Sequence, residues 1–181
     1  MTPKPLFRLV LSALFAALVA VGSYIAIPFV PVPLVLANFF ALLSGLMLGP
    51  VWGGVSVFIY LALGALGFPV FSGGSGGIGH FASPTGGFLL GYLLSAVAAG
   101  LVAHGPAGIK PKPGLLRLAL AGLLAEIVLY AVGLPWLQAA LPGKYATLGA
   151  AFLFMAPIMF GDLVKVAAAA VLARGLLPLL K

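Results

Sequence analysis

Apolar residues run along the chain in long blocks, and short segments rich in proline, glycine or basic residues separate these blocks. A helix needs about 20 predominantly apolar residues to cross a bilayer, and each block reaches or approaches that length. The blocks cover residues 6–27, 34–48, 51–66, 88–102, 115–134 and 146–177. The pattern predicts an all-α integral membrane protein in which residues 1–181 form a single domain of six transmembrane helices.

Glycine and proline shape the connections between the blocks. Only Gly49-Pro50 separates the second block from the third, so we expect these two blocks to form an antiparallel hairpin. The connection 68–87 is long and holds Gly73, Gly74, Gly76 and Gly77. No Lys-Ser/Thr follows these glycines and no strand precedes them, which disfavours a phosphate-binding loop. Since glycine lets the backbone approach a ligand closely, we expect an external lid or re-entrant loop, with a flexible linker as the alternative.

Composition supports the membrane interpretation. The chain is 64% hydrophobic and only 6% charged, whereas a soluble domain has about 25% charged residues. The formal charge of +7 could indicate nucleic-acid binding in a soluble protein, but most of the basic residues flank the apolar blocks. Such flanking charges indicate membrane orientation, so no nucleic-acid partner is expected.

The basic residues also predict which side of the membrane each connection faces. Six crossings put both termini on one side, where Lys4, Arg8, Lys110, Lys112, Arg117, Arg174 and Lys181 would lie, against Lys144 on the other side. Basic residues gather on the cytoplasmic side, so we expect a cell-membrane protein with both termini cytoplasmic. The glycine-rich connection and the connection that holds Trp136 would then be external, above an outward-facing cavity.

Asp162 and Lys165 are the candidate functional residues, because they lie inside the last apolar block. Three residues apart on a helix, they share a face and can pair. A charge in hydrocarbon costs from about 3 to 10 kcal/mol or more, so the pair indicates a functional site. Asp162 could accept ligand N–H groups while Lys165 donates to a carbonyl, as a urea or amide requires. Trp136, Tyr130 and Phe81 could supply apolar walls. A polar clasp between helices is the alternative.

Other residues argue against catalysis and metal binding. The chain has no cysteine, and its two histidines, His80 and His104, are far apart in sequence. Neither a catalytic set nor a metal motif is present, so we expect neither an enzyme nor a cofactor. No nucleotide-binding motif is present either, so energy would have to come from a partner chain or a gradient. A proton relay through Asp162 remains a minor alternative.

Several motifs together resemble the BioY family, the biotin-binding S components of energy-coupling factor (ECF) transporters. They are Pro31-Val32-Pro33-Leu34, Leu48-Gly49-Pro50, Gly67-Phe68-Pro69-Val70-Phe71, Gly73-Gly74-Ser75-Gly76-Gly77, Pro84-Thr85-Gly86-Gly87-Phe88 and Gly161-Asp162-Leu163-Val164-Lys165. The resemblance implies six helices, capture of biotin from outside, and docking to a T component that two ATPase subunits drive.

The resemblance also implies roles for single residues. Asp162 and Lys165 would hold the ureido ring of biotin, and the Gly73–Gly77 loop would cover it. The turn at Thr85 would open the next helix beneath the ligand, and Tyr130 and Trp136 match an aromatic pattern of the family. The chain departs from the family at Ala37-Asn38, where many members have Gln-Thr; Asn38 is a candidate replacement.

Two further expectations concern the small residues of the first block and the group that would meet the biotin carboxylate. Small residues recur in the first block at Ala13, Ala16, Ala17 and Ala20, a pattern that suits close helix packing, either inside the protein or against another subunit. The resemblance implies that Ala16 and Ala20 contact the T component. No arginine lies in the outer half to meet the biotin carboxylate, which leaves His80, Lys144, backbone N–H groups or water.

Two other functions remain open at this stage. The chain could be an S component for a different small vitamin, such as thiamine or riboflavin. It could also be a structural membrane subunit whose ion pair only holds helices together.

Overall fold

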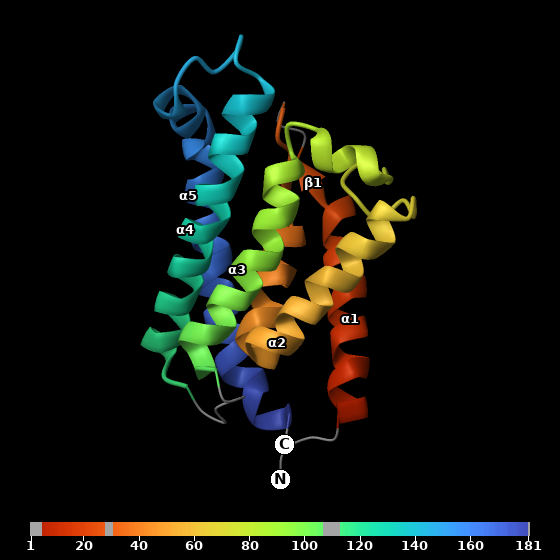
Figure 1. The fold of residues 1–181 in the computed structure, drawn as a ribbon. Coiled ribbons are helices and arrows are strands. Elements are labelled where there is room, and N and C mark those ends of the chain that lie inside the picture. Colours follow the sequence, from red (N-terminus) through yellow and green to blue (C-terminus); the bar gives the residue numbers. More distant parts are fainter. Residues whose placement is uncertain (1–4, 28–30, 107–112, 181) are drawn as a thin grey trace.

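The computed structural model describes residues 5–27, 31–106 and 113–180. They form a bundle of long helices, shown in Figure 1, with one small two-stranded sheet. The elements in order are α1 (Pro5–Tyr24), β1 (Ala26–Ile27), β2 (Leu34–Val35), α2 (Ala37–Ala65), η1 (Ile78–Ala82), α3 (Gly86–His104), α4 (Leu115–Ala140), α5 (Leu148–Leu176) and η2 (Leu177–Leu180). Within the described residues, five helices are long and apolar enough to cross a membrane. The predicted all-α membrane architecture is therefore confirmed.

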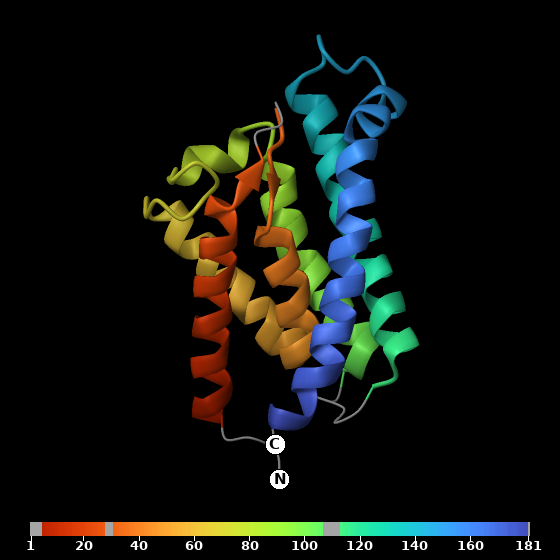
Figure 2. The same ribbon diagram turned by 180° about the vertical axis from the view of Figure 1, so that it is seen from behind.

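α2 contains both the second and the third predicted segment, so the structure has one long interrupted helix where two were expected. Gly49 interrupts it with a φ of 78° and a ψ of −178°. The chain folds back at Gly49. The evidence is a hydrogen bond of 3.3 Å that Ser44 Oγ donates to the Gly53 carbonyl. Residues nine apart in a continuous helix would lie about 13 Å apart along the axis. Figure 2 shows the two arms of α2 meeting in a V. The turn thus lies where Gly49-Pro50 predicts it.

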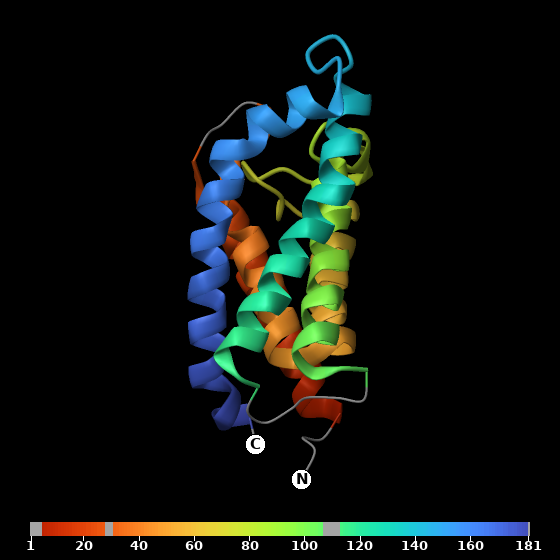
Figure 3. The ribbon, with the colours of Figure 1, turned by 90° about the vertical axis from the view of Figure 1, so that its left-hand side faces the viewer.

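The ends of the described chain lie at one end of the bundle. α1 begins and η2 ends at the lower end in Figures 1 and 3, while the β1/β2 sheet and η1 lie at the upper end. The fold-back in α2 makes this possible, because it adds a reversal of direction. The opposite end therefore carries the irregular segments, as the pattern predicts.

One predicted boundary is wrong in a way that concerns a candidate residue. α4 continues through Pro135 to Ala140, so Trp136 lies in the helix and not in a connection. Proline fixes φ near the helical value and is tolerated in membrane helices when neighbouring groups satisfy the freed carbonyl.

Close approach of small residues holds the centre of the bundle together. A Cβ on Gly45 of α2 would lie 2.1 Å from the Ala96 carbonyl oxygen of α3, and one on Gly100 would lie 2.3 Å from the Pro50 nitrogen. In a membrane, helices associate through such tight packing because lipid removes the hydrophobic drive. The fold-back of α2 is thereby fixed against α3, which forms one wall of the cavity described next.

Candidate functional site

Asp162 on α5 is the most buried charged group in the described structure, with 2% of its surface exposed. Its Oδ1 lies 2.8 Å from Lys165 Nζ, and its Oδ2 accepts a hydrogen bond of 2.5 Å from the Tyr130 hydroxyl on α4. The predicted pair therefore forms, and Tyr130 joins it. The carboxylate is neutralised and hydrogen-bonded, as a buried charge requires.

Lys165 is held from a second direction. Its Nζ donates to the Val35 carbonyl at 2.7 Å and to Asn38 Oδ1 at 2.8 Å. The β1/β2 sheet positions the carbonyl, because Val35 pairs with Ala26 at the end of α1. Asn38 lies in the first turn of α2 and is buried. Three segments of the chain, α5, β2 and α2, thus meet at one ammonium group.

The ion pair lines a small pocket of about 20 Å³. Thirteen residues line this pocket, among them Asp162, Lys165, Asn38 and Tyr130. An adjoining cavity of about 170 Å³ shares five of the lining residues, which are Val32, Pro33, Val35, Phe88 and Tyr92. The two parts are therefore neighbours along a shared apolar wall.

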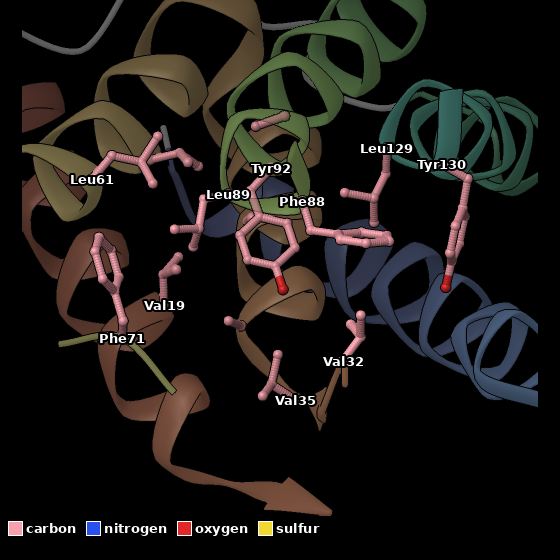
Figure 4. Close-up of a cluster of buried hydrophobic side chains, with 14 of the residues drawn as sticks. Val19, Val32, Val35, Leu61, Phe71, Phe88, Leu89, Tyr92, Leu129 and Tyr130 are labelled. Atoms are coloured by element: carbon pink, nitrogen blue, oxygen red, sulfur yellow. The ribbon is translucent and has the colours of Figure 1, made fainter. Parts of the chain in front are cut away.

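Aromatic and aliphatic side chains form that wall. Figure 4 shows Phe88 and Tyr92 of α3 gathered with Val32 and Val35, and Tyr130 of α4 beside Phe88. The rings of Phe88 and Tyr130 meet edge to face, with centroids 6.0 Å apart. An apolar cavity with a few convergent polar groups is the usual form of a small-molecule site. This one presents a carboxylate acceptor and an ammonium donor to a ligand at one end.

Comparison with known proteins decides the family. The model of the BioY family matches residues 2–181. The chain is 40% identical over 167 residues to the "Probable biotin transporter BioY" of Pyrococcus horikoshii, covering 92% of this chain and 93% of the relative. It is 34% identical over 166 residues to the "Biotin transporter BioY" of Thermotoga maritima, with coverage of 92% and 93%.

The chain belongs to the BioY family. A solved structure agrees with this assignment, namely the crystal structure of the S-component for biotin from an ECF-type ABC transporter. It superimposes with a TM-score of 0.83 and 28% identity, over 94% of this chain and 90% of the other. The resemblance drawn from the sequence motifs is therefore confirmed, and the protein is a transporter component, not an enzyme.

The structure brings some of the predicted BioY site residues together. Asn38, Tyr130, Asp162 and Lys165 meet at one end of the cavity, and Thr85 lines the other part. Asn38 contacts Lys165 directly, which places a polar side chain at the position where the chain departs from the family pattern. Ligand contacts of these five residues stay predictions.

The predicted glycines lie beside the cavity without lining it. Gly73, Gly74 and Gly77 have positive φ values, between 71° and 103°, that favour glycine. At Gly76, a Cβ would lie 2.2 Å from the Phe68 carbonyl oxygen. Their visible role is to fold the loop, whose Ser72 and Ser75 do line the cavity. That the loop covers a ligand stays a prediction.

Trp136 does not line the cavity either. Its Nε1 donates a hydrogen bond of 3.0 Å to the Ser83 carbonyl, so it ties α4 to the segment between η1 and α3. A Cβ on Gly87 would lie 2.3 Å from Trp136 Cβ, which shows how closely α3 and α4 approach here. In this structure Trp136 holds the loop segment against α4, and a contact between Trp136 and a ligand stays a prediction.

The predicted docking residues of α1 are mostly covered. Ala16 is 3% exposed and belongs to the hydrophobic core, and Ala20 is half-buried against it. The neighbouring small residues Ala13 and Ala17 are exposed. Ala16 therefore packs inside the protein in this structure, while Ala13 and Ala17 lie on the exposed side of α1. Contact of Ala16 and Ala20 with a T component stays a prediction.

Sequence reasoning missed Ser23, Tyr60 and Tyr92 as cavity residues. Ser23 of α1 and Tyr60 of α2 share a buried hydrogen bond of 2.8 Å, and Tyr92 contributes to both parts of the cavity. A signal was present, because hydroxyl groups within apolar spans need partners and tend to face the protein interior.

Proposed function

We propose that this chain is the biotin-capturing S component of an ECF-type transporter, with its ligand held in the cavity between the ion pair and the glycine-rich loop. The observation that carries this proposal is the meeting of Asp162, Lys165, Asn38 and Tyr130 at one end of a cavity. The names of the relatives supply the ligand. The urea group of biotin offers two N–H donors beside one carbonyl acceptor.

Biotin would replace some of the existing hydrogen-bond partners of Asp162 and Lys165. Asp162 would accept a urea N–H, and Lys165 would donate to the urea carbonyl. Because Lys165 already has two neutral acceptors, Val35 and Asn38, it can turn toward a ligand without becoming an isolated buried charge. The rings of Phe88 and Tyr92 would cover the apolar part of biotin.

The two alternatives make different demands on the cavity. A structural clasp needs an ion pair between helices and no space beside it, whereas this pair lines a pocket of about 20 Å³ that adjoins a cavity of about 170 Å³. A different vitamin, such as thiamine, carries a positive charge of its own. The cavity end already holds an ammonium and one carboxylate, which suits a neutral planar group better.

The membrane arrangement belongs to the same proposal. The two arms of α2 would serve as two short crossings, which gives the six expected for an S component and places both termini in the cytoplasm. A T component and two ATPase subunits would then supply the energy, with α1 as the candidate docking helix. The common position of the first and last described helices at one end of the bundle supports this arrangement.

Equilibrium binding tests the proposal. Purified protein in detergent should bind biotin in a one-to-one complex, and Asp162→Asn should weaken binding at least about tenfold because an acceptor becomes partly a donor. Lys144→Ala is the matched control, since Lys144 lies over the Tyr145 and Phe154 rings and does not line the cavity. No binding by the wild type, or equal affinities for wild type and Asp162→Asn, would reject the proposal.

A further inference from the structure

The cavity has a second polar region away from the ion pair. Ser72, Ser75, His80 and Thr85 line it from the loop segment that leads into α3, and Ser23 and Tyr60 line it from α1 and α2. Asp162 and Lys165 line only the neighbouring part. A ligand that fills both parts would therefore meet polar groups at both of its ends and apolar side chains between them.

Most hydroxyl hydrogens in this second region are already committed. Ser75 Oγ donates to the Ser72 carbonyl at 2.8 Å, and Ser83 Oγ donates to the His80 carbonyl at 2.7 Å. The Ser83 hydrogen is thus used, so Thr85 must be the donor in the 2.9 Å bond between the two hydroxyl groups. Neither Ser75 nor Thr85 has a hydrogen left for a ligand.

The same count applies to the buried pair on α1 and α2. Ser23 Oγ donates to the Val19 carbonyl at 3.2 Å, which leaves Tyr60 to donate to Ser23 at 2.8 Å. Among the described residues that line this part of the cavity, three side-chain donors have no hydrogen-bond partner. One is the Tyr92 hydroxyl, on the wall shared with the ion-pair part. The other two belong to the loop segment and are the Ser72 hydroxyl and the His80 imidazole N–H.

Packing holds the His80 ring in place without using its nitrogens. The ring lies edge to face on Phe71, with centroids 5.6 Å apart. Phe71 is buried and packs so closely against α2 that a Cβ on Gly64 would lie 2.1 Å from its Cζ. The imidazole is therefore oriented by a rigid neighbour while its donor stays available.

Among the described residues, no lysine or arginine lines this second region of the cavity. Lys144 Nζ lies 5.3 Å from the Phe154 ring centroid, outside the lining of either part of the cavity. Arg117 donates to the Val102 carbonyl near the end of α3. Within the described residues, no arginine lines the cavity.

We propose that His80 and Ser72 bind the carboxylate at the far end of the ligand and so make the site select acids over their neutral derivatives. This inference rests on the proposed function and assigns a subsite to it. A carboxylate accepts hydrogen bonds only, and the two free donors of the loop segment are groups that it can use. Hydrogen bonds to a charged acceptor are stronger than those between neutral groups, so the contact would produce a measurable preference.

The test compares biotin with biotinamide, in which a neutral amide replaces the carboxylate, by titration calorimetry of each purified variant. The wild type should bind biotin more tightly than biotinamide. His80→Phe keeps a ring for Phe71 and removes the imidazole N–H donor, and it should weaken biotin binding about tenfold while leaving biotinamide within about twofold. Ser72→Ala should reduce the preference by a smaller factor. The ratio of the two affinities is taken within one variant, so a partly unfolded sample does not distort it.

Each outcome has one meaning for the subsite. If His80→Phe weakens both ligands equally, or neither, the subsite is rejected. If Lys144→Ala lowers the preference as much as His80→Phe, the assignment is also rejected. Failure of the proposed function itself would look different, because the wild type would then bind neither compound.

Discussion

The two ends of the cavity are built in different ways. At the ion-pair end, α2, α4, α5 and the strand β2 hold Asp162 and Lys165 through an ion pair and three hydrogen bonds. At the loop end, the chain depends on glycine geometry, one packed ring and a few fastening contacts, such as that between Trp136 and Ser83. The helical end is suited to fixing the ligand. The loop end is suited to admitting it, because loops open at lower free energy than packed helices.

Replacement of Lys165 should disrupt the helical end of the cavity more than any other change. Lys165→Met leaves Asp162 buried without its counter-ion, and loss of one partner of a buried pair costs about 3–5 kcal/mol. We expect a clear fall in the thermal unfolding midpoint and loss of biotin binding. The double variant Asp162→Leu/Lys165→Met should regain stability, since no unpaired charge remains, yet bind no biotin. A double variant that still binds biotin would show that the pair only holds helices together.

Tyr130→Phe tests one hydrogen bond of the same end. It removes the donor to Asp162 Oδ2 and keeps the ring packed against Phe88, at an expected cost of about 1.5–3 kcal/mol for a bond to a charged group. Biotin affinity should fall with stability, as measured by calorimetry and thermal unfolding. Tyr145→Phe provides the control, because Tyr145 lies outside the cavity lining. Equal behaviour of the two variants would contradict a role for Tyr130.

Two glycine substitutions test whether the shape of the loop end affects biotin binding. Gly76→Ala would place a Cβ 2.2 Å from the Phe68 carbonyl oxygen, and such overpacking costs about 1–3 kcal/mol. Gly79→Ala meets nothing within 4 Å and needs no positive φ, so it is the matched control. We expect Gly76→Ala to weaken biotin binding mainly through faster dissociation, measured by release of labelled biotin. Indistinguishable release from the two variants would show that loop shape does not matter.

Trp136→Phe should give the smallest effect. It removes the hydrogen bond to the Ser83 carbonyl and keeps an aromatic ring, at about 0.5–1.5 kcal/mol. Protection of the amides of residues 78–85 against hydrogen exchange should decrease while the equilibrium affinity changes little. Unchanged protection would mean that Trp136 does not fasten this segment.

The sequence predicts the ion-pair end better than the loop end. Asp162 and Lys165 stand out because lipid penalises charge, and that penalty acts at any position of an apolar helix. Membrane class and the turn at Gly49 follow from apolar length and from residues that break helices. These properties depend on local composition, so a single chain reveals them.

Other features depend on tertiary packing and could not be predicted. Whether Ala16 or Ala17 faces outward depends on how α1 is rotated against α2, and a repeat of small residues is compatible with both. Trp136 belongs to a helix because α4 tolerates Pro135, which propensity alone disfavours. Val35 contributes through its carbonyl, a group that every residue carries, so no sequence pattern could mark it.

That carbonyl has an evolutionary consequence. A side-chain acceptor can be deleted by one codon change, but a main-chain oxygen survives every substitution at its own position. Related chains are therefore free to exchange Val35 for other strand-forming residues while the ammonium stays in place. What selection must preserve there is the register Ala26 with Val35 and Ile27 with Leu34, because a slip of one residue would turn the oxygen away from Lys165.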